Sequence, residues 1–187
     1  MSTVAENKYS PNITPRGIRN NNPTNLILTK INWVGKIPNE LNSDGKFEQF
    51  KEMKLGVRAG MMDILNDYAE GTNTIRKLIT ELAPPTENNT ENYIKIIAKK
   101  TGLNPDKIIN LTERNFLNLM NAIIEVEQGF TLDPSYIMNG YNLLPTNKKA
   151  LIQIENSPYS NGSKLVIFGI VCTGVLLAYN YYSNERN

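Results

Sequence analysis

The sequence contains no histidine and a single cysteine, Cys172, among its 187 residues. Without histidine the chain cannot build a Ser-His-Asp triad, a Cys-His nucleophile or a histidine-ligated zinc site. One cysteine cannot form an intramolecular disulfide, and Cys172 lies in an apolar run, so we expect it to act as a small hydrophobic residue. If the chain is an enzyme, carboxylates are expected to do its chemistry, with no metal and no cofactor.

A charge excess of either sign is also lacking. Lys and Arg number 20 and Asp and Glu 18, which gives a formal net charge of +2, and the chain has no basic run. Nucleic-acid-binding surfaces concentrate Lys and Arg on one face. We therefore expect no nucleic-acid partner.

Charged residues are absent from the stretch between Leu165 and Tyr182. Its length falls within the roughly 17 to 25 residues that a helix needs to cross a bilayer. Lys164 precedes it, and tyrosines of the kind found at membrane interfaces stand at its end. The pattern predicts a transmembrane helix at 164–183 that anchors the chain in a lipid bilayer, followed by a polar tail at 184–187. The alternative is a buried core helix.

The rest of the chain divides into three parts by composition. Residues 1–15 are polar and without periodicity, which predicts a flexible N-terminal arm. Residues 16–142 carry the periodic apolar positions of a folded domain. Residues 143–163 are polar with short apolar patches, which predicts a linker.

Within the domain the patterns predict a mainly α (α+β) fold. Two short runs, 31–37 and 46–50, flank the turn-forming residues Asn42 to Gly45, which predicts a small β-hairpin wing. Helices are predicted from Leu55 to before Gly71, from Ile75 to Leu82 before Pro84, from the cap Thr90 to Gly102, at Asn104-Pro105, and from the cap Thr112 to Gly129.

Several separated motifs resemble a family of virion structural proteins from membrane-containing phages and prophages. In order, they are Arg16-Gly-Ile-Arg-Asn-Asn-Asn-Pro-Thr-Asn25, Trp33-Val-Gly35, Phe47-Glu-Gln-Phe50, Gly56-Val-Arg58-Ala59 and Ala83-Pro-Pro-Thr-Glu-Asn-Asn-Thr90. Thr24 stands where the family usually has glycine, and Gln128 where we expect asparagine. The resemblance implies a virion protein associated with an inner or capsid-associated membrane and with other capsid proteins.

The segment Val126-Glu127-Gln128-Gly129-Phe130 is similar to the one that carries the catalytic glutamate in lytic transglycosylases and related lysozyme-like enzymes. In related enzymes that glutamate precedes an Asn-containing segment and a Trp, whereas here 17–20 and Trp33 come before Glu127. The resemblance therefore implies a lysozyme-like domain with a permuted chain order, in which Glu127 lies beside the Asn-rich loop and the wing.

By this resemblance, Glu127 is the expected catalytic acid of a peptidoglycan-cleaving lytic transglycosylase or muramidase-like enzyme. A helix C-terminus with a neighbouring carboxylate, here Glu125, favours the protonated form that an acid catalyst needs. A lytic transglycosylase uses one glutamate as acid and then as base, because the sugar's own 6-hydroxyl replaces water. A hydrolase usually needs a second carboxylate, for which Asp44 and Glu48 are the candidates.

Substrate contacts are expected from Asn20, Asn21, Asn22 and Asn25, which can hydrogen-bond sugar hydroxyls, and from Trp33, which can stack on a sugar ring. Each has a structural alternative. Asparagines also cap helices and form turns, Trp is commonly a core residue, and Glu127 fits an exposed acid on a solvated face equally well. Arg58 is a candidate partner for Glu127 or Glu125, in a structural or a positioning role.

Three functions therefore remain open. The first is a virion-associated muralytic enzyme used in host entry, which predicts that Glu127 lines a cleft. The second is a non-catalytic minor capsid protein that links the virion membrane to the shell. The third is a lysis-stage membrane protein such as a holin, which a single apolar stretch and a large folded domain disfavour.

Overall fold

The computed structural model describes residues 14–86 and 89–153. The chain separates into two compact units after Gln153, and the first unit holds all the residues that are described. Most of the predicted arm, the second half of the linker, the predicted transmembrane helix 164–183 and the polar tail lie outside these residues. Within the two described ranges, no helix is long and apolar enough to span a bilayer.

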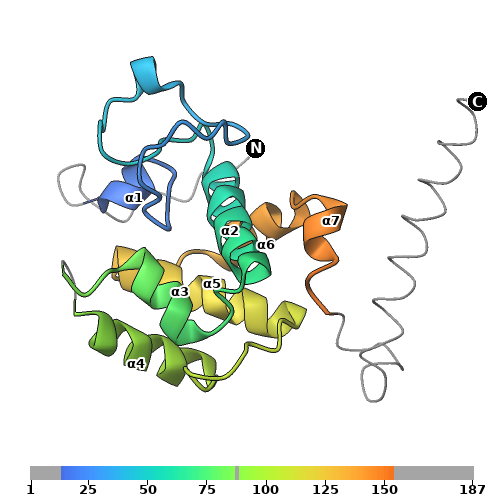
Figure 1. The fold of residues 1–187 in the computed structure, drawn as a ribbon. Helices are drawn as coiled ribbons and strands as arrows, with labels where there is room; N and C mark the ends of the chain where they lie inside the picture. Colours follow the sequence, from blue (N-terminus) through green and yellow to red (C-terminus); the bar gives the residue numbers. More distant parts are fainter. Residues whose placement is uncertain (1–13, 87–88, 154–187) are drawn as a thin grey trace, which may run out of the picture. The chain divides into compact units, whose positions relative to one another are not determined.

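Helices dominate the described part of the chain, which confirms the prediction of a mainly α fold (Figure 1). They are α1 (Arg16–Arg19), a 3-10 helix η1 (Asn39–Leu41), α2 (Met53–Glu70), α3 (Ile75–Leu82), α4 (Thr90–Thr101), α5 (Glu113–Gln128), α6 (Pro134–Asn142) and α7 (Thr146–Lys149). Helix α2 packs against α6, α4 packs against both α3 and α5, and α1 contacts α5.

The predicted β-hairpin wing is wrong, because the described residues contain isolated bridges and no strand. One isolated bridge, Lys36–Phe50, joins the two runs, and a second bridge joins Ile27 to Phe47. Gly35 takes a φ of +76°, so the first run cannot continue as an extended strand. Side-chain amides organise the loops instead: the side-chain Oδ1 of Asn42 accepts the backbone N–H groups of Asp44 and Gly45.

Helix α2 lies between two hydrophobic clusters. Its residues Val57, Met61 and Ile64 are buried in the main core with the other helices. Its Ala59 belongs to a smaller cluster with Trp33 and with other residues of the N-terminal loops. The N-terminal loops therefore pack directly against α2.

The N-terminal loop and α2 approach each other at glycines. A Cβ atom at Gly56 would collide with the backbone carbonyl of Asn21, and one at Gly60 would collide with the side chain of Thr24. Glycine at both positions lets the Asn-rich loop 20–25 lie directly on the helix. This contact fixes where the loop stands relative to the helical core.

The predicted caps are mostly confirmed. Thr112 accepts the N–H of Asn115 at the start of α5, and Gly71, Gly102 and Gly129 end their helices in the left-handed conformation. Helix α4 is capped by the Asn89 side chain, one residue before the predicted Thr90. Thr90 is instead buried, and its hydroxyl donates to the carbonyl of Ala83.

The short helix predicted at Asn104-Pro105 is wrong. The Asn104 side chain accepts the N–H of Asp106 and forms a turn there. Arg76 at the start of α3 then pairs with Asp106 and with Glu91 of α4, which ties the turn to both helices.

The described half of the predicted linker, 143–153, lies on the core. Leu144 and Ile152 are buried, and α7 stands between them. Gln153 forms a parallel bridge with Thr112, next to the first turn of α5. The first unit therefore extends to Gln153.

Candidate functional site

Glu127 lies in the last turn of α5 and is half-buried. One carboxylate oxygen accepts a hydrogen bond from the Asn25 side-chain amide at 2.8 Å. The other accepts a hydrogen bond from the Tyr93 hydroxyl, also at 2.8 Å. The carboxylate is thus held where the Asn-rich loop, α4 and α5 meet. The sequence resemblance predicts that Glu127 lies beside that loop, and the hydrogen bond from Asn25 agrees with this position.

Tyr93, in the first turn of α4, is buried in the main core, and its hydroxyl donates to Glu127. Burial, together with the negative charge and hydrogen bond of Glu127, raises the pKa of the Tyr93 phenol well above its usual value. The phenol therefore keeps its proton across the physiological pH range and serves as a donor to Glu127.

Asn25 reaches Glu127 from a left-handed backbone conformation with a φ of +54°. Asn is one of the few residues that tolerates this conformation in a tight turn. Its backbone N–H donates to the carbonyl of Asn22, which closes the turn around Pro23. The Asn-Pro turn therefore exists with Thr24 in place of the family's usual glycine.

The other candidate asparagines face inward. The amide of Asn22 is fully buried and bonds the backbone of Leu26 and of Glu48, while the Asn21 amide donates to the carbonyl of Phe50. The buried Asn20 amide donates to Asp44 and accepts from Gln49. Among the four candidates, Asn25 is the one placed beside Glu127, and substrate roles for the others stay predictions.

The first candidate second carboxylate, Asp44, holds together the turn that contains it. Its oxygens accept hydrogen bonds from Asn20 and from the backbone N–H groups of Lys46 and Phe47. The Asn20 hydrogen bond and these backbone bonds lower the pKa of Asp44, against a smaller opposing effect of burial. Arg16 adds an ion pair at 3.4 Å.

The second candidate, Glu48, is fully buried in an ion pair with Lys36, at 2.8 Å. The same oxygen accepts the backbone N–H and hydroxyl of Thr29. Lys36 also donates to the carbonyls of Thr29 and Ile31, so its three N–H groups have acceptors. The pair locks the loops 29–36 and 46–50 together.

Two further predicted contacts are placed elsewhere. Trp33 is buried in the smaller hydrophobic cluster, where it packs with Phe50. Arg58 donates to the carbonyl of Leu143. Arg58 is therefore not observed as the partner of Glu125 or Glu127: Glu125 pairs with Lys100 of α4 at 2.7 Å, and Glu127 accepts from Asn25 and Tyr93.

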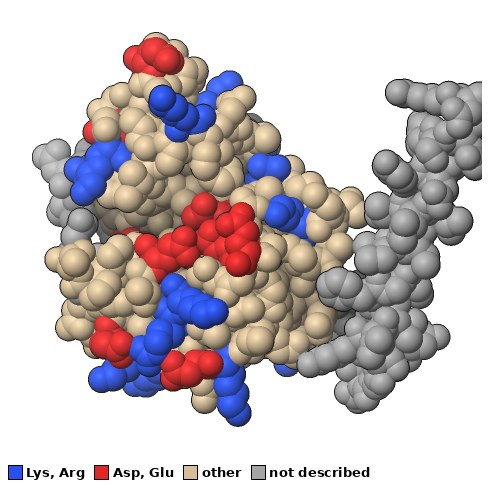
Figure 2. All heavy atoms as spheres, in the orientation of Figure 1, with Lys and Arg blue, Asp and Glu red and all other residues tan. Residues whose placement is uncertain are grey.

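A group of acidic side chains lies over α2 and α3 near the middle of the face in Figure 2. Asp63, Asp67, Glu70 and Glu81 repel one another there. Burial, and then the charges of these neighbours, raise the pKa of Asp67 to about 6. Within the two described ranges, no set of three or more potential ligand residues is arranged to hold a metal ion.

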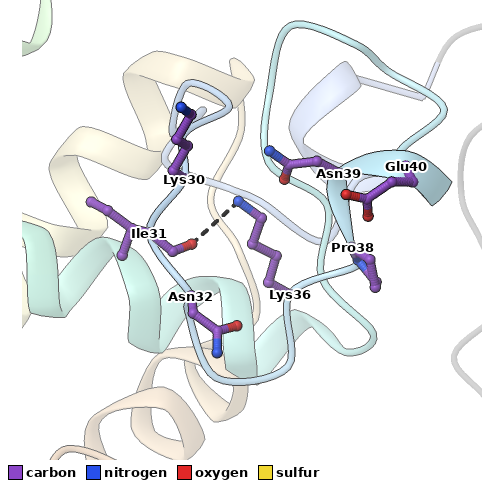
Figure 3. Close-up of a pocket in the computed structure, with 7 residues that line it drawn as sticks. All are labelled: Lys30, Ile31, Asn32, Lys36, Pro38, Asn39 and Glu40. Atoms are coloured by element: carbon purple, nitrogen blue, oxygen red, sulfur yellow. Dashed lines mark hydrogen bonds between the residues drawn. The ribbon is translucent and has the colours of Figure 1, made fainter.

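A hollow of about 330 Å³ opens among the N-terminal loops (Figure 3). It is lined by Lys30, Ile31, Asn32, Lys36, Pro38, Asn39 and Glu40. Figure 3 shows the Lys36 ammonium directed at the Ile31 carbonyl. Because that ammonium is already saturated and Glu127 is not part of the lining, this hollow does not provide the predicted cleft at Glu127.

Sequence reasoning missed two residues of the site. The apolar spacing of the predicted helix between Thr90 and Gly102 places Tyr93 on its buried face, and that spacing does not indicate a hydroxyl contact with Glu127. Gln128 was noted only as a departure from a motif, yet its buried amide donates to the carbonyl of Pro23 at 2.9 Å. Its position beside Glu127 was the available signal.

Comparison with known proteins identifies a relative among phage proteins. No family model matches the sequence. Over 123 residues the chain is 38% identical to Protein P5 of Pseudoalteromonas phage PM2, a match that covers 63% of this chain and 74% of that protein. The predicted relationship to phage proteins is confirmed at this level, while lysozyme-like character is not part of the finding. The chain belongs to the family of Protein P5 of phage PM2.

Proposed function

We propose that this chain is a phage virion protein that cleaves the glycan strands of peptidoglycan, with Glu127 as its catalytic carboxylic acid. The observation that carries the proposal is the junction at which Asn25 and Tyr93 hold the two oxygens of Glu127. These three residues come from three distant segments of the chain. A glutamate exposed on a solvated helix face would instead hydrogen-bond to water.

The chemistry requires a carboxyl group that gives and then recovers one proton. Glu127 donates its proton to the glycosidic oxygen as the bond from that oxygen to C1 breaks. The carboxylate then takes the proton of the sugar's 6-hydroxyl while that oxygen bonds to C1, which closes an anhydro ring. Each carboxylate oxygen has a second acceptor position, so the bonds from Asn25 and Tyr93 leave room for the transferred proton.

The positions of the other carboxylates favour this one-glutamate scheme over hydrolysis. Asp44 is engaged in its own turn and Glu48 is fully buried against Lys36. Neither is positioned by these contacts to activate a water molecule beside Glu127. The proposed activity is therefore that of a lytic transglycosylase. The alternative is a muramidase, whose products would carry a hydrolysed reducing end in place of an anhydro end.

The test is a clearing assay of purified peptidoglycan by the full chain, its Glu127→Gln variant and its Glu125→Gln variant. Glu125 is a matched control on the same helix turn. The sequence suggests it as the carboxylate that acts on Glu127, but in the structure its charge is paired with that of Lys100 at 2.7 Å. We expect Glu127→Gln to abolish clearing and Glu125→Gln to keep it. Product analysis by mass then separates an anhydro end from a hydrolysed one.

Folded wild-type protein that does not clear peptidoglycan would overturn the catalytic proposal. Equal loss of clearing in both variants would also count against it, because it would indicate a general defect of α5.

A non-catalytic capsid protein is the second candidate function, and the same junction gives it support. The hydrogen bonds from Asn25 and Tyr93 to Glu127 also join the N-terminal loops to the helices, as a purely structural link would. Such a protein would connect the virion membrane to the shell. Its mark would be a folded chain that neither sediments with peptidoglycan nor clears it.

We further propose that the protein resides in the virion and is anchored there by residues 164–183. The relationship to a phage protein and the charge-free stretch of the sequence support this location. Running the clearing assay on purified virions, before and after lipid extraction, tests both points. Activity that is absent from washed particles would contradict them.

A further inference from the structure

Gln128 follows Glu127 directly and turns its side chain into the protein. The side chain is 6% exposed. Its amide nitrogen donates to the carbonyl of Pro23 at 2.9 Å and lies 3.4 Å from the side-chain oxygen of Asn25. Two adjacent residues at the end of α5 thus hold the same turn, one through the Asn25 amide and one through the Pro23 carbonyl.

Gly17 of α1 leaves the space that the Gln128 side-chain amide occupies. A Cβ atom at position 17 would collide with both the nitrogen and the oxygen of that amide. Helix α1 contacts α5 at this place, so the glutamine is enclosed between the loop and the two helices. The conformation of the Gln128 side chain is therefore restricted, and its hydrogen bond in turn restricts the position of the Pro23 carbonyl.

Asn25 needs such external support. Its φ of +54° lies in the left-handed region, which costs most residues with a Cβ atom about 1 to 2 kcal/mol and Asn less than most. Release of the Pro23 carbonyl would let the turn 22–25 relax out of the left-handed region, and this would turn the Asn25 amide away from Glu127.

Gln128 is an unusual choice for a purely structural contact. Its side-chain oxygen is buried and has no hydrogen-bond partner within the described structure. Burying an unpaired polar oxygen costs stability, so an apolar side chain of the same length would serve packing as well or better. What the apolar side chain could not do is donate to Pro23.

We infer that Gln128 is the positioning residue of the site: its hydrogen bond to the Pro23 carbonyl holds the Asn25 amide against the Glu127 carboxylate. The catalytic meaning of this inference rests on the proposed function, but the geometric part does not. Gln128→Met removes the donor and keeps the length, and Gln128→Leu does so with a different shape. Gln153→Met, at an exposed glutamine, is the control.

The test follows the Asn25 side-chain amide by NMR in the full, ¹⁵N-labelled chain, with Asn25→Ala to identify its signal. We expect Glu127→Gln to shift this signal. Gln128→Met is expected to move it as well, and to remove the further response to Glu127→Gln. In the clearing assay, kcat should fall about 10- to 100-fold with little change in KM, as for a displaced catalytic group. Gln153→Met should change neither.

The two ideas fail separately. An Asn25 signal that is unmoved in both folded Gln128 variants would overturn the positioning role, whatever the activity. If that signal moves as expected but no form of the chain clears peptidoglycan, the positioning role stands and the catalytic proposal falls. A rise in KM with unchanged kcat would also contradict positioning, because it would place Gln128 in substrate binding.

Discussion

At the scale of single residues, the site depends on pairs that are far apart in the chain. Asn25 and Glu127 are separated by 102 positions, and Tyr93 and Glu127 by 34. Each residue alone has an ordinary local role, as a turn former, a helix end or a core position. The environment of the Glu127 carboxylate is therefore determined by its contacts with Asn25 and Tyr93, and no single residue indicates it.

The Tyr93 hydroxyl is the donor whose removal can be tested most cleanly. Tyr93→Phe keeps the buried ring and deletes the hydrogen bond to Glu127. An intramolecular hydrogen bond contributes about 0.5 to 1.5 kcal/mol, so we expect the free energy of unfolding to fall by about 1 kcal/mol. Urea denaturation of the full chain at neutral pH measures it.

Tyr136→Phe is the control for this prediction, because Tyr136 is 44% exposed. Its free energy of unfolding should change by less than about 0.5 kcal/mol. Equal effects of the two substitutions would show that the Tyr93 hydroxyl contributes nothing specific.

At the scale of elements, local sequence predicted the helices well and the loops poorly. Helices α3 and α5 begin at the threonine caps or apolar positions that their spacing indicated. Helix α6 was not predicted, although Asp133 caps it and Pro134 occupies its first turn, a pattern that could have identified it. Caps and periodicity are interactions within one helix, so the sequence alone displays them.

The acidic group on α2 and α3 predicts how these helices respond to pH. In the folded state burial, and then neighbouring charges, raise the pKa of Asp67 to about 6 from an ordinary 3.8. The folded state therefore binds the Asp67 proton more tightly than the unfolded state does. As pH rises from about 4 to about 6, the contribution of Asp67 to the free energy of unfolding falls.

Asp67→Asn should accordingly raise stability at pH 7.5. The gain should be about 1 kcal/mol at most, because partial exposure lets solvent screen the charges, and it should vanish below about pH 4. Thermal unfolding across this pH range measures it. Asp133→Asn is the control: the Ser135 side-chain hydrogen bond lowers the pKa of Asp133, so no gain at pH 7.5 is expected there. A gain that persists at low pH would contradict the electrostatic explanation.

At the scale of the whole molecule, the first unit is closed by a segment that composition placed in a linker. Leu144 and Ile152 are buried against the helices. The hydroxyl of Tyr141 donates to Glu113 at 2.9 Å, and the Lys149 ammonium lies over the Tyr141 ring. This closure joins the end of the described chain to the start of α5.

Adjacent leucines test the closure. Leu144→Ala in the full chain should lower the free energy of unfolding by about 2 to 5 kcal/mol, the usual cost of truncating a buried leucine. Leu143→Ala, at a residue 43% exposed, should cost less than about 0.5 kcal/mol. Denaturant unfolding of both variants gives the comparison. If the two costs are similar, the segment 143–153 does not contribute to the core in solution.

The sequence by itself determined the mainly helical class and most helix boundaries, because these follow from composition, periodicity and caps. The resemblance of residues 126–130 to lytic transglycosylases indicates Glu127, whose role stays a prediction. The tertiary structure decided the rest. The wing predicted from two short runs became loops, because Gly35 and the buried Lys36–Glu48 pair fix a different path. Likewise, only folding brought Asn25 and Tyr93 to Glu127 and the Pro23 carbonyl to Gln128, since contacts between distant segments leave no mark on the local pattern of any one of them.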